Sequence, residues 1–133
     1  MTMFLQHLDA GQRRALVIFA YYVMAADNEV APEELAIVAA LEHELGLEGC
    51  IHPGEMLVEP LFSEFPDRRS RMAVMLKLYA VAHADRKIHP KERAMLDDYA
   101  RRIGLTEAEV AALDQWGQRH TALVEEARRL VEG

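Results

Sequence analysis

The chain has 133 residues, of which 51% are hydrophobic and 7% aromatic, and it carries a formal net charge of −7. This length is typical of one domain, and we expect residues 1–133 to form one. A single cysteine excludes an intrachain disulfide and favours a reducing, cytoplasmic location. The uncharged run Ala15–Ala26 is shorter than the roughly 20 residues of a bilayer-spanning helix, and no export signal is recognisable, so we expect no transmembrane segment.

Charge is unevenly distributed along the chain. Residues 15–66 contain ten acidic residues and no Lys or Arg, whereas residues 67–105 contain ten basic and five acidic residues. Two solvated helical faces that attract each other within the fold would explain this pattern. The alternative is a homodimer, or an assembly with another protein, that places the acidic half against the basic half. The basic half has no interleaved aromatic residues and no nucleic-acid motif, so we expect no nucleic-acid partner.

The first half of the chain predicts one short helix and two long helices. Met3–Leu8 predicts a short helix that ends at residues 9–11, and Gln12–Ala26 predicts a central helix because it is apolar on nearly all sides. A polar loop follows, and Pro32 suits the first position of the next helix. That helix should end at Gly46, a left-handed cap. Its predicted buried positions are Leu35, Val38, Leu41 and Leu45.

The second half predicts a further short helix and three long ones. Gly54–Phe65 forms the short helix, and helices follow from Pro66 to about Ala84 and over Pro90–Ile103. Thr106 and Glu109 form a capping box that starts a last helix towards residue 131, which Gly117 could bend or split. No strand-like alternation persists anywhere. The predicted fold class is therefore all-α, with about seven helices.

One pattern occurs twice, 58 residues apart. Ala25–Glu34 returns as His83–Glu92, with Asp, an aliphatic residue, Pro and Glu at the same places. The Gly-Leu pair that ends the following helix also returns at this offset. Self-similarity at a fixed offset indicates a repeated supersecondary unit. We therefore predict an internally duplicated helix-loop-helix unit over about residues 15–47 and 73–105.

Each repeat keeps an acidic pair, Asp27 with Glu34 and Asp85 with Glu92. The spacing matches the second half of an EF-hand calcium loop, but apolar residues or His replace the oxygen ligands of the first half, so the EF-hand assignment fails. Two interpretations stay open. The carboxylates of each pair could share a divalent cation, for which Ca²⁺ or Mg²⁺ suits oxygen ligands better than Zn²⁺ does. Alternatively, the Asp caps the turn and the Glu caps the helix start.

The two loops differ in their suitability for a cation. Asn28 follows the first Asp and tolerates positive φ cheaply, whereas Arg86 stands at the matching place in the second loop. Four basic residues surround the second pair and should weaken cation binding there by Coulomb repulsion. These residues are Arg86, Lys87, Lys91 and Arg93. If one loop binds a cation, we expect it to be the first.

The histidines offer a weaker alternative. His83, Asp85, His89 and Glu92 lie close in sequence, but their spacing is not a common zinc pattern. His83 falls on an apolar helix face and is expected in the core, and His89 is expected at the surface. An enzyme would require His83, Asp85 and Glu92 to converge in a concave pocket. No other histidine has an evident partner for nucleophilic chemistry, so we predict no enzyme activity.

Two copies of Ala-Asp-x-x-(Val/Ile)-x-Pro-x-Glu, each preceded by an apolar helix with Tyr and closed by Gly-Leu, resemble the TerB-like tellurite-resistance family. That family is also similar to the N-terminal domain of membrane-anchored DnaJ-type co-chaperones. The resemblance covers residues 15–105. It implies an all-α fold, a divalent-cation role for Asp27, Glu34, Asp85 and Glu92, and a stress-response or membrane-associated scaffold without established enzyme activity. The family usually has Gly after the Asp, where this chain has Asn28 and Arg86.

The expected function is that of a non-catalytic TerB-like interaction domain with a divalent cation at its duplicated loops. Its partners would be proteins, including a second copy of the chain. The alternative is a purely structural interaction or dimerisation domain, in which the Asp and Glu residues act only as turn and helix caps.

Overall fold

A computed structural model describes residues 4–26, 32–52, 54–55, 58, 62–84 and 88–133. Within these residues the chain is helical and contains no strand, which confirms the all-α prediction. The five α-helices are α1 (Ala10–Met24), α2 (Pro32–Glu44), α3 (Arg68–Ala82), α4 (Pro90–Arg102) and α5 (Glu107–Glu132). Two short 3₁₀ helices, η1 (Leu5–His7) and η3 (Phe62–Glu64), complete the described elements.

The two short predicted α-helices are absent from the described residues, which therefore contain five α-helices rather than about seven. In the first region only the single turn η1 forms, after Phe4 in a left-handed conformation (φ +64°). In the second region the described residues include η3, which ends two residues before Pro66. A 3₁₀ turn is the usual helical form for such short segments.

Acidic side chains set the start of the two central helices. Asp9, predicted to lie in a helix exit, instead caps α1: its side chain accepts a hydrogen bond from the Gln12 N–H (2.8 Å), and the Gln12 side chain accepts one from the Asp9 N–H (3.0 Å). Asp67 caps α3 by accepting from the Ser70 N–H (2.7 Å). This is why α1 begins two residues before its predicted start and α3 two residues after Pro66.

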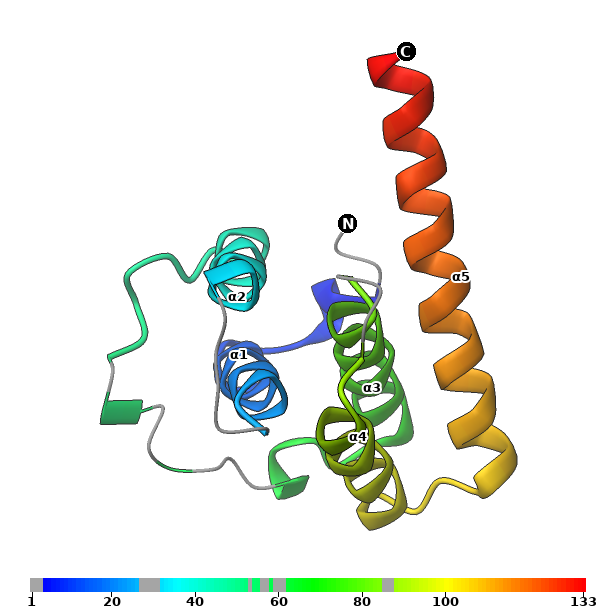
Figure 1. Cartoon of the computed structure of the whole chain (residues 1–133). Coiled ribbons are helices and arrows are strands. Elements are labelled where there is room, and N and C mark those ends of the chain that lie inside the picture. Colours follow the sequence, from blue (N-terminus) through cyan, green and yellow to red (C-terminus); the bar gives the residue numbers. More distant parts are fainter. Residues whose placement is uncertain (1–3, 27–31, 53, 56–57, 59–61, 85–87) are drawn as a thin grey trace.

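The helix α3 occupies the centre of the arrangement. It contacts α1, α4 and α5, and α2 packs against α1 (Figure 1). The core draws side chains from all five α-helices, and its largest fully buried members include Phe19, Tyr79, Tyr99 and Leu96. On α2, Val38 and Leu41 are buried as predicted, but Leu35 is 51% exposed, so that position was wrongly assigned to the buried face.

The first hairpin (α1 and α2) and the second hairpin (α3 and α4) have corresponding helix starts that lie 58 residues apart. The helices α1 and α3 both have 15 residues and begin at residues 10 and 68, and α2 and α4 both have 13 residues and begin at residues 32 and 90. The caps Asp9 and Asp67 keep the same offset. So do the bonds at the helix ends, where the Leu47 N–H donates to the Glu42 carbonyl and the Leu105 N–H to the Ala100 carbonyl. The duplication itself remains a prediction.

Gly104 ends α4 in a left-handed conformation (φ +88°), which side chains with a Cβ adopt at a cost. Gly104→Ala should therefore lower the free energy of unfolding by about 1 kcal/mol, as measured by urea unfolding followed by circular dichroism. Gly54→Ala is the matched control, because Gly54 has no positive φ and its added Cβ would meet no atom of the described residues within 4 Å. Equal losses in both variants would contradict the assignment.

The last helix is continuous through Gly117, where a bend or break was predicted. A Cβ at Gly117 would lie 2.8 Å from His83 Cδ2 and 3.1 Å from the Tyr79 carbonyl oxygen. The glycine therefore allows α5 to approach α3 closely rather than bending the helix. The C-terminal half of α5 projects beyond the other helices (Figure 1). No helix in the described part of the chain combines the length and apolarity needed to cross a membrane.

Candidate functional site

Half of the predicted site can be placed in the structure. Glu34 and Glu92 are both the third residue of a helix, of α2 and of α4 respectively. Asp27 and Asp85 lie outside the described residues, so the geometry of each Asp–Glu pair is not described. The described part of the predicted site thus consists of the two glutamates.

Both glutamates are buried. Glu34 is 8% exposed and Glu92 is 3% exposed, although each stands in a first helical turn where acidic side chains are usually solvated. The adjacent Glu33 is exposed. An exposed carboxylate in the first turn still interacts favourably with the helix dipole. Burying a carboxylate is costly unless it is paired, hydrogen-bonded or bound to a cation. Neither Glu34 nor Glu92 lacks a partner within the chain.

The described residues alone do not assemble a metal site. Among them, no three His, Cys, Asp or Glu side chains gather as they would around a metal ion. The two hairpin loops are not tested by this observation, since Asp27 and Asp85 are not among the residues considered. Any cation bound at these loops would need ligands from the loop residues together with Glu34 or Glu92.

The histidines near the second loop have structural roles. His83 is buried, as predicted, and its Nε2 lies 2.8 Å from Asp114 Oδ1 on α5. His89 is exposed, also as predicted, and its Nδ1 accepts a hydrogen bond from the Lys91 N–H at the start of α4 (3.1 Å). The cavity beside His83 has a volume of about 150 Å³. Its lining is His83, Gln118, Thr121 and Ala122, and thus does not include Glu92.

Asp114 is the centre of a polar cluster that the sequence did not predict. Besides His83, its carboxylate contacts Arg93 Nη1 (2.7 Å) and Gln118 Nε2 (3.0 Å). Burial alone would raise the pKa of Asp114, but the hydrogen bonds from His83 and Arg93 outweigh it and hold that pKa below its usual value. Arg93 was expected to repel a cation at the second loop. Its guanidinium is instead paired with Asp114, which reduces that repulsion.

A second buried polar contact joins α3 to α4. The Tyr79 hydroxyl donates a hydrogen bond to Asp97 Oδ1 at 2.8 Å. Burial, followed by this hydrogen bond to a carboxylate, raises the pKa of Tyr79. Residues 79 and 97 share no local motif, so only the tertiary structure shows that they meet. The two polar contacts therefore join α3, and the residue that follows it, to α4 and to α5.

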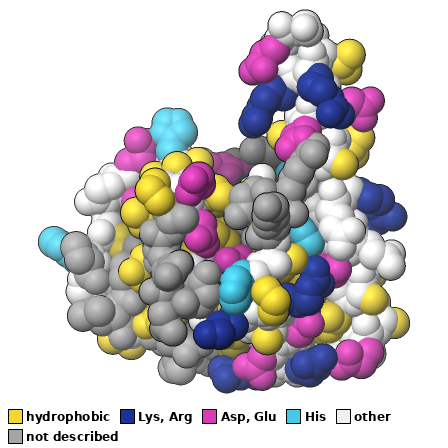
Figure 2. Space-filling view, viewed as in Figure 1, with side chains coloured by type: hydrophobic (Ala, Val, Ile, Leu, Met, Phe, Trp, Pro, Cys, Tyr) yellow, Lys and Arg dark blue, Asp and Glu magenta, His cyan; other side chains and the backbone are white. Residues whose placement is uncertain are grey.

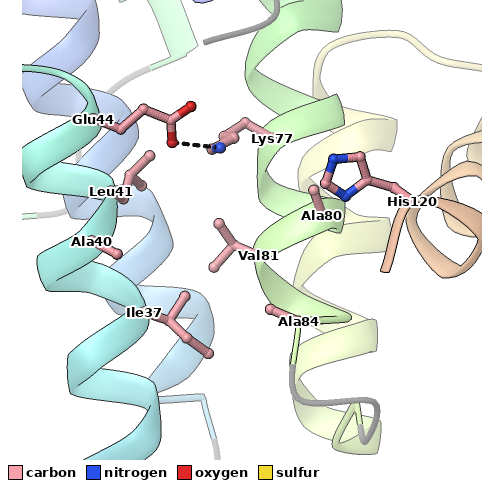
Figure 3. A pocket seen from close by; sticks show the side chains of 9 residues that line it. All are labelled: Ile37, Ala40, Leu41, Glu44, Lys77, Ala80, Val81, Ala84 and His120. Atoms are coloured by element: carbon pink, nitrogen blue, oxygen red, sulfur yellow. Dashed lines mark ion pairs between the residues drawn. The ribbon is translucent and has the colours of Figure 1, made fainter. Parts of the chain in front are cut away.

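A shallow groove of about 230 Å³ separates α2 from α3 and reaches α5 (Figure 3). Its lining is apolar except for Glu44, Lys77 and His120. Glu44 and Lys77 form an ion pair across the groove (2.7 Å). Burial, followed by the charge of nearby Lys77, lowers the pKa of His120. The lining residues are Ile37, Ala40, Leu41, Glu44, Lys77, Ala80, Val81, Ala84 and His120.

Ion pairs connect basic residues of the basic half (residues 67–105) to acids elsewhere in the fold. Lys77 of the basic half pairs with Glu44 of the acidic half, as the interpretation of attraction within the fold expected. Other bases of the basic half pair with the start of α5 instead: Arg68 with Glu109, and Arg101 with Glu107 at 2.9 Å. With Arg93, which pairs with Asp114, three basic residues of this half therefore pair with acids of α5.

Part of the chain matches a known protein family. Residues 56–115 match the family model described as tellurite resistance protein TerB, which confirms the resemblance over α3, α4 and the start of α5. The matched region contains the second predicted repeat and not the first. Searches of curated proteins and of solved structures found no similar protein.

Proposed function

Because residues 56–115 match the TerB family, we propose that this protein is a non-catalytic TerB-like domain that binds a divalent cation at its two hairpin loops. It would act as a cytoplasmic stress-response domain that docks on other proteins. The family match favours a role without catalysis. Among the described residues, the lining of the cavity beside His83 does not include Glu92, which the enzyme alternative requires beside His83.

The burial of Glu34 and Glu92 is the observation that carries this proposal. Glu34 and Glu92 are each the third residue of a 13-residue helix, and both are buried. Glu33, the residue before Glu34, is exposed. A helix-capping role alone does not require burial, and a buried carboxylate is well compensated by a hard cation. Asp27 with Glu34, and Asp85 with Glu92, would supply carboxylate oxygens, which suit Ca²⁺ or Mg²⁺ better than Zn²⁺.

Internal duplication is part of the proposal, and the equal spacing of helix starts, caps and helix ends supports it. If the two hairpins derive from one ancestral unit, the acidic pair was kept in both. A bound cation would add charge neutralisation and hold the end of the first helix of each hairpin to the start of the second. The angle of the hairpin, and the surface that it presents to a partner, would then respond to the cation.

Calorimetric titration of the chelator-treated protein with Ca²⁺, Mg²⁺, Mn²⁺ and Zn²⁺ tests the proposal. We expect binding of Ca²⁺ or Mg²⁺, with at least a tenfold loss of affinity at the first site in Glu34→Gln and at the second site in Glu92→Gln. Glu33→Gln is the matched control, since it removes the same charge from an exposed neighbour. The first loop should bind more tightly, because Arg86 and Lys87 lie in the second.

The capping alternative predicts a different result in the same experiments. No cation would produce heat below millimolar concentration, and Glu34→Gln would bind no less than Glu33→Gln. Asp27→Ala would then lower stability by about 1 kcal/mol, as the loss of a cap does. That combination would leave a purely structural interaction domain.

A further inference from the structure

Two cavities on the described surface adjoin at the C-terminal end of α3. The first is the groove of about 230 Å³ between α2 and α3 (Figure 3). The second, here called the α5 hollow, has a volume of about 150 Å³ and lies between the end of α3 and the C-terminal half of α5. Both are lined by Ala80, Ala84 and His120. A ligand that lies over the two alanines therefore occupies both cavities.

The groove is apolar and narrow. Ile37 and Leu41 of α2 and Val81 of α3 form its walls (Figure 3). At one end the Glu44 carboxylate and the Lys77 amine are 2.7 Å apart, so a single ion pair spans from α2 to α3 and neutralises both charges. A helix with its side chains is about 10–12 Å wide, too wide to enter between two helices that one ion pair connects. An unbranched alkyl chain is much narrower and suits the apolar walls.

The α5 hollow carries a positive charge. Arg128 lines it together with Val124 and Thr121. Arg128 forms no ion pair within the described part of the chain. Glu125 also lines this hollow, but it has an interaction partner of its own. Figure 2 shows basic and hydrophobic side chains together on the projecting part of α5. The guanidinium of Arg128 therefore favours an anionic group in the α5 hollow.

Thr121 gives a second reason to expect a hydrogen-bond acceptor in the α5 hollow. It is 8% exposed, and its hydroxyl has no hydrogen-bond partner among the described residues. A buried hydroxyl without a partner is costly, and a carboxylate in this hollow would compensate it. His120 lies where the two cavities adjoin. Burial, followed by the charge of Lys77, lowers its pKa, so its ring is neutral at pH 7 and is compatible with an apolar chain.

We propose that the groove and the α5 hollow form one binding site for an alkyl carboxylate, such as a fatty acid. Its carboxylate pairs with Arg128, and its chain passes over Ala80 and Ala84 into the groove. If a methylene group takes about the volume of a water, roughly 30 Å³, the groove of about 230 Å³ has room for roughly eight methylene groups. A medium-length chain therefore fits.

Amide NMR titration with sodium decanoate, in EDTA and up to about 10 mM ligand, tests this site. We expect saturable shifts centred on Ala80, Ala84 and Val124, with a Kd on the order of 1 mM because the cavities are shallow. Decyltrimethylammonium has the same chain and the opposite charge. It should bind at least about threefold more weakly than decanoate. In Arg128→Glu this order should be reversed.

Two further variants separate this site from general attraction between amphiphiles and protein. Arg129→Glu is the matched control, because it makes the same charge change at an exposed neighbour that lines neither cavity, and it should still prefer decanoate. Ala84→Phe fills the passage between the two cavities and should weaken decanoate binding at least about tenfold. Ala84 is exposed, so the amide signals of the core should keep their positions in this variant.

Three results would overturn the proposal. The first is the absence of saturable shifts with decanoate in the unmodified chain. The second is equal affinity of the unmodified chain for the two amphiphiles, which would indicate an apolar surface without an anion site. The third is a preference for decanoate that persists in Arg128→Glu. Because the titrations are done in EDTA, none of these results bears on the cation proposed at the hairpin loops.

Discussion

Phe19→Ala should lower the free energy of unfolding by about 3–5 kcal/mol, the loss typical of truncating a buried phenylalanine. Phe19 is fully buried on α1. Its ring centroid lies 4.7 Å from that of Phe62, 5.2 Å from that of Tyr99 and 6.2 Å from that of Phe65. These contacts join the first hairpin to α4 and to the segment between the hairpins. The truncation therefore leaves a cavity where these three parts of the fold meet.

Urea unfolding followed by far-ultraviolet circular dichroism measures this loss. Leu35→Ala is the control, because Leu35 is a large apolar residue that is 51% exposed, and its truncation should change stability by less than about 0.5 kcal/mol. A loss below about 1 kcal/mol in Phe19→Ala would show that the aromatic cluster does not hold the two hairpins together.

Asp114→Ala should lower the free energy of unfolding by about 2–3 kcal/mol at neutral pH, because it leaves His83 and Arg93 without the carboxylate that they share. His83 is buried and Arg93 is partly exposed, so the greater part of the loss comes from the histidine. Asp98→Ala is the matched control. Asp98 pairs with Arg102 at the surface of α4 (3.0 Å), and such pairs contribute less than about 1 kcal/mol.

The pH dependence of stability gives a second measurement of the same cluster. Its hydrogen bonds hold the pKa of Asp114 below the ordinary value of 3.8. A depressed pKa stabilises the fold fully above the unfolded-state pKa, and this stabilisation is lost as the pH falls through the folded-state pKa. The difference in stability between the unmodified chain and Asp114→Ala should therefore shrink below about pH 4. A difference that is constant down to pH 2.5 would contradict the assignment.

Local signals predicted the helix boundaries where a single residue type determines them. Pro32 and Pro90 start α2 and α4, Gly46 and Gly104 follow their ends, and Thr106 caps α5. In these cases the residue that starts, caps or ends the helix lies within a few residues of the boundary, so the sequence alone reveals the boundary.

The starts of α1 and α3 were predicted less well, although a signal was present. Asp9 lies directly before Ala10 and Gly11, which resembles a helix exit, and Pro66 resembles a helix start. The structure makes Asp9 and Asp67 the caps. These two aspartates are 58 residues apart, so extending the repeat towards the N-terminus would have identified both caps.

Long-range contacts could not be predicted from this sequence. His83 meets Asp114 across 31 residues, and Tyr79 meets Asp97 across 18. No helical spacing links either pair, because their proximity depends on how α4 and α5 pack against α3. The exposure of Leu35 has a related cause: periodicity identifies an apolar residue, whereas the neighbouring helices decide whether anything covers it.

The candidate site was predicted in part. The sequence placed Glu34 and Glu92 in the first turns of their helices, and the structure agrees. Their burial did not follow from the pattern, since a glutamate in a first turn is expected to be solvated. Burial depends on how each helix start packs against the rest of the fold. It is also the feature on which the proposed cation role rests.

Backbone amide NMR with substoichiometric Mn²⁺ tests the cation sites most directly, because the paramagnetic ion broadens only the signals near its binding position. We expect broadening first at the start of α2 around Glu34 and then at the start of α4 around Glu92, and its removal by excess Ca²⁺ or Mg²⁺. Broadening spread over exposed carboxylates elsewhere, or confined to the acidic start of α5, would contradict a cation role for the two hairpin loops.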